Sequence, residues 1–249
     1  DPYWKEIAGE SFLDKYKLFK TEYKYTGSSD LNIQIDDPIV AQPAILFYQI
    51  GLIEVYKSFN IIPSKVIGHS AGEIASFYCA NSISLKDAIK ISYYRSIYQQ
   101  MTAGTGNMLV VGITKEELDL LLERKNFVLD NLEEACVNDY NSTVIAGPSD
   151  EINKLNKILK DENIFNAIIR GRCPFHSSLQ NIIKEKILDA TKDIIFNEPD
   201  ITLISTVTGE EINKENYHKD YWWKNIRDRV NFANGIKSMD NIDIFIEIG

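Results

Sequence analysis

The chain has 249 residues, of which 44% are hydrophobic and 25% charged, and its formal net charge is -9. This composition excludes a disordered chain, and the acidic balance argues against nonspecific nucleic-acid binding. The length predicts a substantial core, in one large domain or in a domain that carries a smaller insert.

The chain also lacks several signals of other protein classes. No apolar run approaches the length that spans a bilayer, so we expect no membrane partner. Its three cysteines, Cys79, Cys136 and Cys173, are odd in number and widely spaced, which favours free thiols in a reducing, cytoplasmic compartment. No metal-ligand spacing occurs, and we expect no metal.

The first long element is an amphipathic helix over residues 43–59. Its apolar residues recur at steps of three and four, and Pro43 suits the first helical turn. This spacing is carried by Ile45, Tyr48, Leu52, Tyr56 and Phe59. A short buried strand, "SKVIG", is predicted to follow the helix.

The stretch "GHSAG" then places Ser70 between Gly68 and Gly72, at the junction of this strand and a predicted helix. A sharp strand-to-helix turn lifts a serine hydroxyl above the sheet, and the two glycines would remove clashing Cβ atoms. The backbone N–H of Ala71 would face a developing oxyanion, aided by the helix dipole. From these residues alone, a simple glycine-bounded turn remains the alternative.

A second long helix is predicted from Ser84, which forms a capping-box pair with Asp87, to about Met101. Arg95 lies on its apolar stripe, in line with Ala88 and Ile91. A guanidinium in such a position needs an anion, and its planar donors suit a substrate carboxylate as well as a structural one.

Residues 108–170 alternate as strand, helix, strand, strand, helix and strand. This order predicts a ferredoxin-like split unit, inserted in a larger domain formed by residues 1–107 and 171–249. In the larger domain, "ITLISTVTG" and "IDIFIEI" are nearly continuous apolar runs, as expected for strands covered on both faces. The predicted fold class is therefore α/β.

A serine nucleophile needs a base, and the chain has three histidines. His69 adjoins Ser70, and neighbouring side chains on an extended segment diverge, so it is a poor base for that serine. His218 lies in a charged and aromatic surface loop. His176 in "PFHSS" follows Pro174, which restricts the backbone, and it is our candidate base, with a buried structural histidine as the alternative.

These motifs together resemble the malonyl-CoA:acyl-carrier-protein transacylases, and within them the acyltransferase domains of type I polyketide and fatty-acid synthases. The resemblance covers about residues 40–249. It is carried in order by "QPAILFYQIGLIEVY", "VIGHSAGEIASFYCANSISLKDAIKISYYRS", "GNMLVVGI", "CVNDYNSTVIAG", "PFHSS", "STVTG", "YWWKNIRDRVNF" and "FIEIG".

The resemblance implies an α/β-hydrolase-like core with a ferredoxin-like insert, and a role for each matching residue. Ser70 would carry the acyl group, His176 would be its base, Asn225 would orient the histidine, and Arg95 would clamp the free carboxylate of the extender unit. Substrate contacts would come from Phe175, His69 and Ala71. Phenylalanine before the histidine goes with malonyl, and serine with methylmalonyl, because a ring leaves little room for an α-methyl branch.

The implied substrates are malonyl-CoA and the phosphopantetheine thiol of an acyl carrier protein, with no bound cofactor. Neighbouring synthase domains such as a ketosynthase would be further partners. In the family, a strand and a Gly-Gln-Gly loop that helps build the oxyanion hole come first, and a proline follows "EIG". Neither feature is found here, so we expect a fragment of a longer chain.

Three other functions compete with this hypothesis. The enzyme could load methylmalonyl or another acyl group, or act as a serine thioesterase or hydrolase that passes the acyl group to water. Hydrolases usually need a carboxylate partner, and Asp139 and Asp161 fall in the predicted insert. A docking scaffold without turnover is the third alternative, and the presence of Ser70, His176 and Arg95 argues against it.

Overall fold

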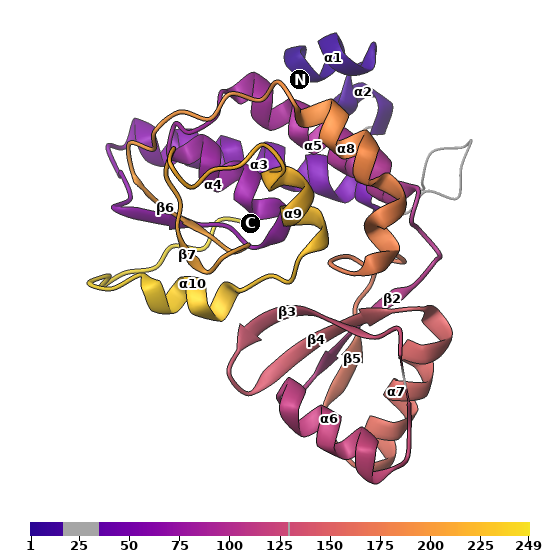
Figure 1. Cartoon of the computed structure of the whole chain (residues 1–249). Helices are drawn as coiled ribbons and strands as arrows, with labels where there is room; N and C mark the ends of the chain where they lie inside the picture. Colours follow the sequence, from indigo (N-terminus) through magenta and orange to yellow (C-terminus); the bar gives the residue numbers. More distant parts are fainter. Residues whose placement is uncertain (17–34, 129) are drawn as a thin grey trace, which may run out of the picture.

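The computed structural model describes residues 1–16, 35–128 and 130–249. They form a mixed α/β structure with two separate sheets (Figure 1). The strands are β1 (Lys65–Ile67), β2 (Asn107–Val111), β3 (Glu133–Asp139), β4 (Ser142–Gly147), β5 (Asn166–Ile168), β6 (Thr202–Ser205) and β7 (Glu210–Glu211). The α-helices are α1 (Pro2–Ala8), α2 (Phe12–Tyr16), α3 (Pro38–Ser58), α4 (Glu73–Cys79), α5 (Leu85–Gln100), α6 (Lys115–Arg124), α7 (Ser149–Asp161), α8 (Lys184–Thr191), α9 (Tyr221–Arg227) and α10 (Phe232–Ser238).

The smaller sheet has the order β1-β6-β7, with β1 parallel to β6 and β7 antiparallel to β6. Helices α3, α4 and α5 pack against one another beside it. The largest apolar cluster among the described residues lies here, and Phe77, Leu203 and Trp222 are among its fully buried members. This part of the molecule places β1 directly before Ser70.

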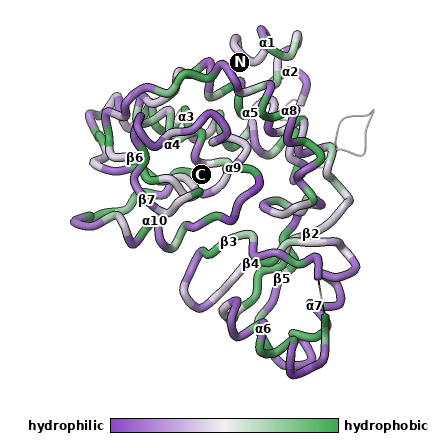
Figure 2. The backbone as a smooth tube through the Cα atoms, in the orientation of Figure 1, coloured by the Kyte–Doolittle hydropathy of each residue, from purple (hydrophilic) through white to green (hydrophobic). Residues whose placement is uncertain are grey.

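The larger sheet is antiparallel throughout, with the order β3-β4-β2-β5. Successive side chains along its strands point to opposite faces of the sheet, as in any pleated sheet. Leu109 and Ile145 join the cluster that packs under α6 and α7, whereas Met108 and Val144 join a second cluster that includes Val230. Hydrophobic residues occur around both sheets, as the green segments of the backbone show (Figure 2).

Helix α3 differs from its prediction in both start and burial. It begins at Pro38, with Asp37 at the N-cap position, so Pro43 lies inside the helix rather than in its first turn. The predicted stripe is not the buried face, because Ile45 and Tyr48 are exposed. The face that packs inward is formed by Pro38, Val40, Pro43, Leu46 and Ile53.

By length and composition alone, α3 is also apolar enough to cross a bilayer, which corrects the expectation that no such run exists. One helix of this kind is weak evidence for a membrane span, because a helix in the core of a protein can be equally long and apolar. Here α3 packs along α5 and α4.

The second long helix is confirmed as α5, and Ser84 caps it by accepting a hydrogen bond from the Asp87 amide. The full reciprocal capping box belongs instead to Thr114 and Glu117 at the start of α6. The strand and helix order predicted for residues 108–170 is also observed.

Two strands were predicted near the end of the chain. Among the described residues, the first is shorter than predicted and the second does not form. The run 201–209 pairs only over β6, and the chain then turns, with Gly209 at φ 81°. Residues 242–248 belong to no ladder in the described part of the chain, and Ile244, Phe245 and Ile246 are exposed. A strand needs a neighbour for its backbone groups, and none of the described strands pairs with this segment.

Candidate active site

Ser70 lies on the sharp turn that leads from β1 through a short 3-10 turn (Ser70–Gly72) into α4. Its φ is 53°, in the left-handed region that a serine rarely adopts. A Cβ on Gly68 would come within 2.3 Å of the carbonyl carbon and oxygen of Gly72, so only glycine fits there. The prediction that Gly72 also removes a clashing Cβ is wrong. A Cβ added there would meet only Gln49 Nε2, at an ordinary contact distance of 3.6 Å.

His176 is brought to Ser70 from 106 residues away, with 2.8 Å between Nε2 and the serine Oγ. Its other ring nitrogen, Nδ1, lies 2.9 Å from the backbone carbonyl oxygen of Asp228. Because a carbonyl oxygen can only accept, Nδ1 carries the proton and Nε2 is free to accept from the serine hydroxyl. His176 also has a positive φ, of 55°.

Burial sets the charge state of this histidine. The His176 side chain is almost inaccessible to solvent, and this burial, together with the positive charge of Arg95, lowers its pKa to about 3. The imidazole is therefore neutral at physiological pH, which is the state a general base requires.

Asn225 does not orient the histidine, contrary to the sequence prediction. Its side-chain amide donates to the carbonyl oxygen of Ser70, at 3.0 Å, and to the carboxylate of Glu73, at 2.8 Å. Its own oxygen has no hydrogen-bond partner among the described residues. The Asp228 carbonyl takes the predicted role, and Asn225 holds the turn that carries the serine.

Arg95 lies beside the serine in a buried position on α5. One terminal nitrogen donates to Ser70 Oγ at 3.0 Å and the other to Gln42 Oε1 at 2.9 Å. Nε is buried and has no partner among the described residues. Burial lowers the pKa of Arg95 to about 10, which still leaves it cationic at neutral pH. These two partners of its terminal nitrogens in the described part of the chain are an amide and a hydroxyl, and neither is a carboxylate.

The buried carboxylate of Glu73, three residues after the serine, was not predicted as part of the site. It accepts from the amide and hydroxyl of Thr206, from Tyr221 and from Asn225. Burial raises the pKa of Glu73, and these hydrogen bonds oppose that shift. The only signal in the sequence was a single acidic residue at the start of the apolar run "GEIASFYCA".

The remaining predicted residues surround this centre. His69 Nε2 lies 2.7 Å from Asn138 Oδ1 on β3. Ala71 follows Ser70 in the 3-10 turn. Phe175 is half-buried against the apolar cluster that contains Met108 and Val230, and His218 is exposed, as predicted.

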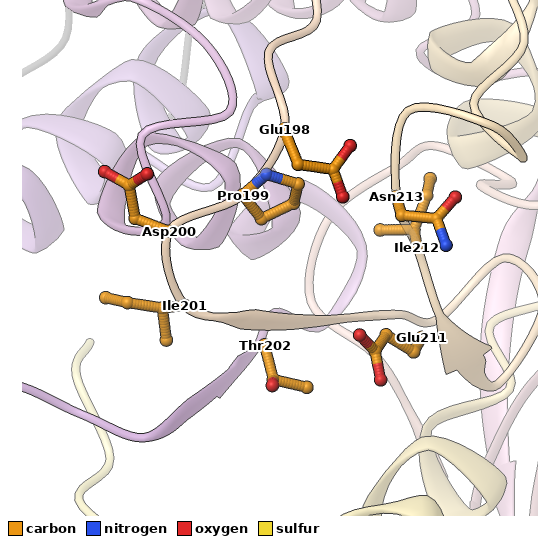
Figure 3. A pocket seen from close by; sticks show the side chains of 8 residues that line it. All are labelled: Glu198, Pro199, Asp200, Ile201, Thr202, Glu211, Ile212 and Asn213. Carbon is orange, nitrogen blue, oxygen red and sulfur yellow. The ribbon is translucent and has the colours of Figure 1, made fainter.

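A hollow lies beside β6 and β7, and three of the residues that line it are carboxylates (Figure 3). It is lined by Glu198, Pro199, Asp200, Ile201, Thr202, Glu211, Ile212 and Asn213. Among the residues that the structure describes, no cluster of three His, Cys, Asp or Glu side chains could hold a metal. The three cysteines are free and buried.

Comparisons with known proteins agree on one family. The sequence model described as "Acyl transferase domain" matches residues 30–249. "Probable polyketide synthase 17" of Dictyostelium discoideum is 40% identical over 227 residues, which are 87% of this chain and 9% of that protein. This chain thus spans about a tenth of the length of the curated relatives it matches.

Two solved structures show the same fold. One is the acyltransferase domain from module 8 of the salinomycin polyketide synthase, with a TM-score of 0.79 at 26% identity, covering 96% of this chain and 55% of that one. The other is MCAT from Streptococcus pneumoniae, with a TM-score of 0.80 at 20% identity, covering 100% of this chain and 79% of that one.

Proposed function

Because the chain belongs to the acyl transferase domain family, we propose that it moves a malonyl unit from CoA to the phosphopantetheine thiol of an acyl carrier protein. One observation carries the proposal: Ser70 Oγ lies between an acceptor, His176 Nε2 at 2.8 Å, and a cation, Arg95 at 3.0 Å. An acceptor at the hydroxyl activates the serine as a nucleophile, and a cation beside it suits an acyl group that ends in a carboxylate.

The proposed reaction has two half-reactions through an acyl-serine. His176 takes the hydroxyl proton as Ser70 Oγ attacks the thioester carbonyl, and the Ala71 N–H and the adjoining helix terminus stabilise the oxyanion. The C–S bond breaks, and the leaving CoA sulfur receives the proton from His176. The carrier thiol then gives its proton to His176, attacks the acyl-serine and leaves as the malonyl thioester, while Ser70 recovers its proton.

Arg95 supplies the selection for a carboxylated acyl group. Its Nε has no partner among the described residues, and acylation disrupts its bond to Ser70, so we expect these donors to become available to an incoming carboxylate. An acyl group without a carboxylate would leave a buried guanidinium poorly paired, which costs about 1 to 3 kcal/mol.

We expect Arg95→Ala to weaken malonyl loading by about ten- to a hundredfold and to favour acetyl relative to malonyl, because the charge match is lost. Acylation rates with malonyl-CoA and acetyl-CoA measure this ratio. Lys90→Ala is the matched control, since Lys90 is on the same helix and pairs with Asp193 at the surface. If the malonyl and acetyl rates fall together, Arg95 is structural.

Phe175 is proposed to set the preference of malonyl over methylmalonyl. In competition, the intact chain should load mainly malonyl, and Phe175→Ser should gain methylmalonyl by a factor that corresponds to about 1 to 3 kcal/mol, the value of one methyl group. Phe165→Ser removes an exposed ring and should leave the ratio unchanged. Equal loading of both groups by the intact chain contradicts the steric explanation.

The order β3-β4-β2-β5 supports classing residues 108–170 as a ferredoxin-like insert. We further propose that residues 1–107 and 171–249 form an α/β-hydrolase-like core. The similarity to polyketide synthases supports a place beside carrier and ketosynthase domains in a synthase, and a cytoplasmic location stays a prediction. No bound cofactor or metal enters the proposed reaction.

Mass spectrometry of the chain after incubation with malonyl-CoA tests the function directly. We expect one malonyl adduct on Ser70, which is discharged by an acyl carrier protein bearing phosphopantetheine and persists in buffer. Rapid discharge in buffer would establish the alternative, a thioesterase or hydrolase. A chain that acquires no adduct from malonyl-CoA, methylmalonyl-CoA or acetyl-CoA would be a scaffold without turnover.

A further inference from the structure

The hydrogen bond that orients His176 joins two segments that are far apart in the sequence. His176 belongs to the segment before the second 3-10 turn (Ser178–Ile183), and its acceptor, the Asp228 carbonyl, follows α9. Neither segment is a long rigid element. The two segments contact each other, since Arg227 Nε donates to Asn181 Oδ1 at 3.3 Å and Ile183 packs in one cluster with Trp223 and Ile226. A third part of the molecule also contacts both of them.

That third part is the start of β3, where one carboxylate contacts both segments. Glu133 Oε1 accepts a hydrogen bond from the backbone amide of Ser178, two residues after the histidine, at 2.6 Å. Its Oε2 pairs with Arg227, the residue before Asp228, at 2.8 Å. Both side chains are mostly shielded from solvent, with 30% of Glu133 and 26% of Arg227 exposed.

Further contacts join the segment that follows Asp228 to β3. The amide of Val230 donates to the Ala135 carbonyl, and the Val137 amide donates to the Val230 carbonyl, both at 2.9 Å. Arg229 pairs with Glu134. The acceptor segment is thus held on both sides of Asp228, and Glu133 joins it to the histidine segment through a single side chain.

We propose that Glu133 is a positioning residue that sets the distance between the His176 ring and the Asp228 carbonyl, and through it the tautomer of the base. The assignment rests on the proposed role of His176. Glu133 does not contact Ser70 or the reacting atoms, and it acts through the backbone of the two segments that it joins.

The charge of Glu133 agrees with this role. Burial raises its pKa, but the hydrogen bonds from Ser178 and the charge of Arg227 outweigh burial, so the net shift lowers the pKa. The carboxylate is ionised at neutral pH, and a charged acceptor holds an amide and a guanidinium more strongly than a neutral one.

The test compares Glu133→Ala and Glu133→Gln with a control, Glu162→Gln. Glu162 is similarly shielded and pairs with Arg124 and Lys125 inside the same part of the chain. We expect Glu133→Ala to lower the acylation rate constant about tenfold with the KM for malonyl-CoA unchanged, since small displacements of a base are costly. Glu133→Gln keeps one acceptor oxygen and should lose less, and Glu162→Gln should lose nothing.

A second measurement does not depend on activity. In the chain labelled with 15N-histidine, the Nδ1 proton of His176 should give a downfield resonance that Glu133→Ala moves upfield or broadens and Glu162→Gln leaves in place. An unchanged resonance and rate constant in a folded Glu133→Ala chain overturns the proposal. If that variant does not fold, Glu133→Gln and Arg227→Gln carry the same test, and their double variant should lose no more than the worse single one.

The two measurements also separate this proposal from the proposed function. An unaltered chain that shows the downfield proton but no acylation would contradict the acyltransfer function alone. Normal acylation in every Glu133 variant, with the resonance unmoved, would contradict the positioning role alone.

Discussion

Replacing Ser70 by alanine is expected to abolish formation of the acyl-enzyme, with no malonyl adduct detectable by mass spectrometry after incubation with malonyl-CoA. The reason is geometric: the serine Oγ is the atom that both His176 and Arg95 contact, at 2.8 and 3.0 Å. Without it, the base has no proton to take, and the proposed pocket has no nucleophile.

The fold should survive this change, because Ser70 contributes a hydroxyl rather than a packed side chain and its backbone conformation is set by the surrounding turn. The melting temperature should therefore stay close to that of the unaltered chain. Ser58→Ala, which removes an exposed hydroxyl that bonds only to the Val55 carbonyl among its described contacts, should still take the adduct. An adduct on another residue of Ser70→Ala would place the nucleophile elsewhere.

The pairing of Ser70 with His176 could be inferred from sequence because both residues stand in local patterns with chemical meaning. A serine between glycines at a strand-to-helix junction predicts an exposed hydroxyl, and only one of three histidines has a restrained backbone before it. The prediction that both glycines are needed in this turn is confirmed in part. A side chain would not fit at Gly68, whereas one would fit at Gly72.

The acceptor for His176 could not be inferred in this way. It is a backbone carbonyl, which every residue possesses, so no residue type marks it. The nearby asparagine was the more visible candidate, yet Asn225 is engaged by the Ser70 carbonyl and by Glu73. The Glu73 network is likewise tertiary, since its donors are Thr206, which directly follows β6, and two residues of α9, Tyr221 and Asn225.

The fold shows the same division between local and tertiary information. The elements of residues 108–170 and helix α5 follow from periodicity and capping, which act within a few residues. Helix α3 has apolar residues on more than one face, so spacing alone did not show which face packs inward. Residues 242–248 have strand composition, but strand formation depends on a neighbour that composition does not encode.

The second large effect is expected for His176→Ala, which should lower the acylation rate by at least two orders of magnitude, roughly the contribution of a general base. His218→Ala is the matched control, because the side chain of that histidine is exposed, and the change should leave the rate unchanged. A loss of tenfold or less in His176→Ala would assign proton transfer to another group.

The pH dependence gives an independent check on the same residue. With its pKa lowered to about 3, His176 stays neutral in the folded chain well below pH 6.5, so acylation should not titrate there as it would with an ordinary histidine. The unfolded chain, in contrast, binds a proton at this histidine near pH 6.5. Between those two values the unfolded state therefore holds more protons, and stability must fall as the pH falls. The melting temperature of the unaltered chain should drop from pH 7.5 to pH 5 by more than that of His176→Ala, and an equal drop in both would contradict a buried, neutral base.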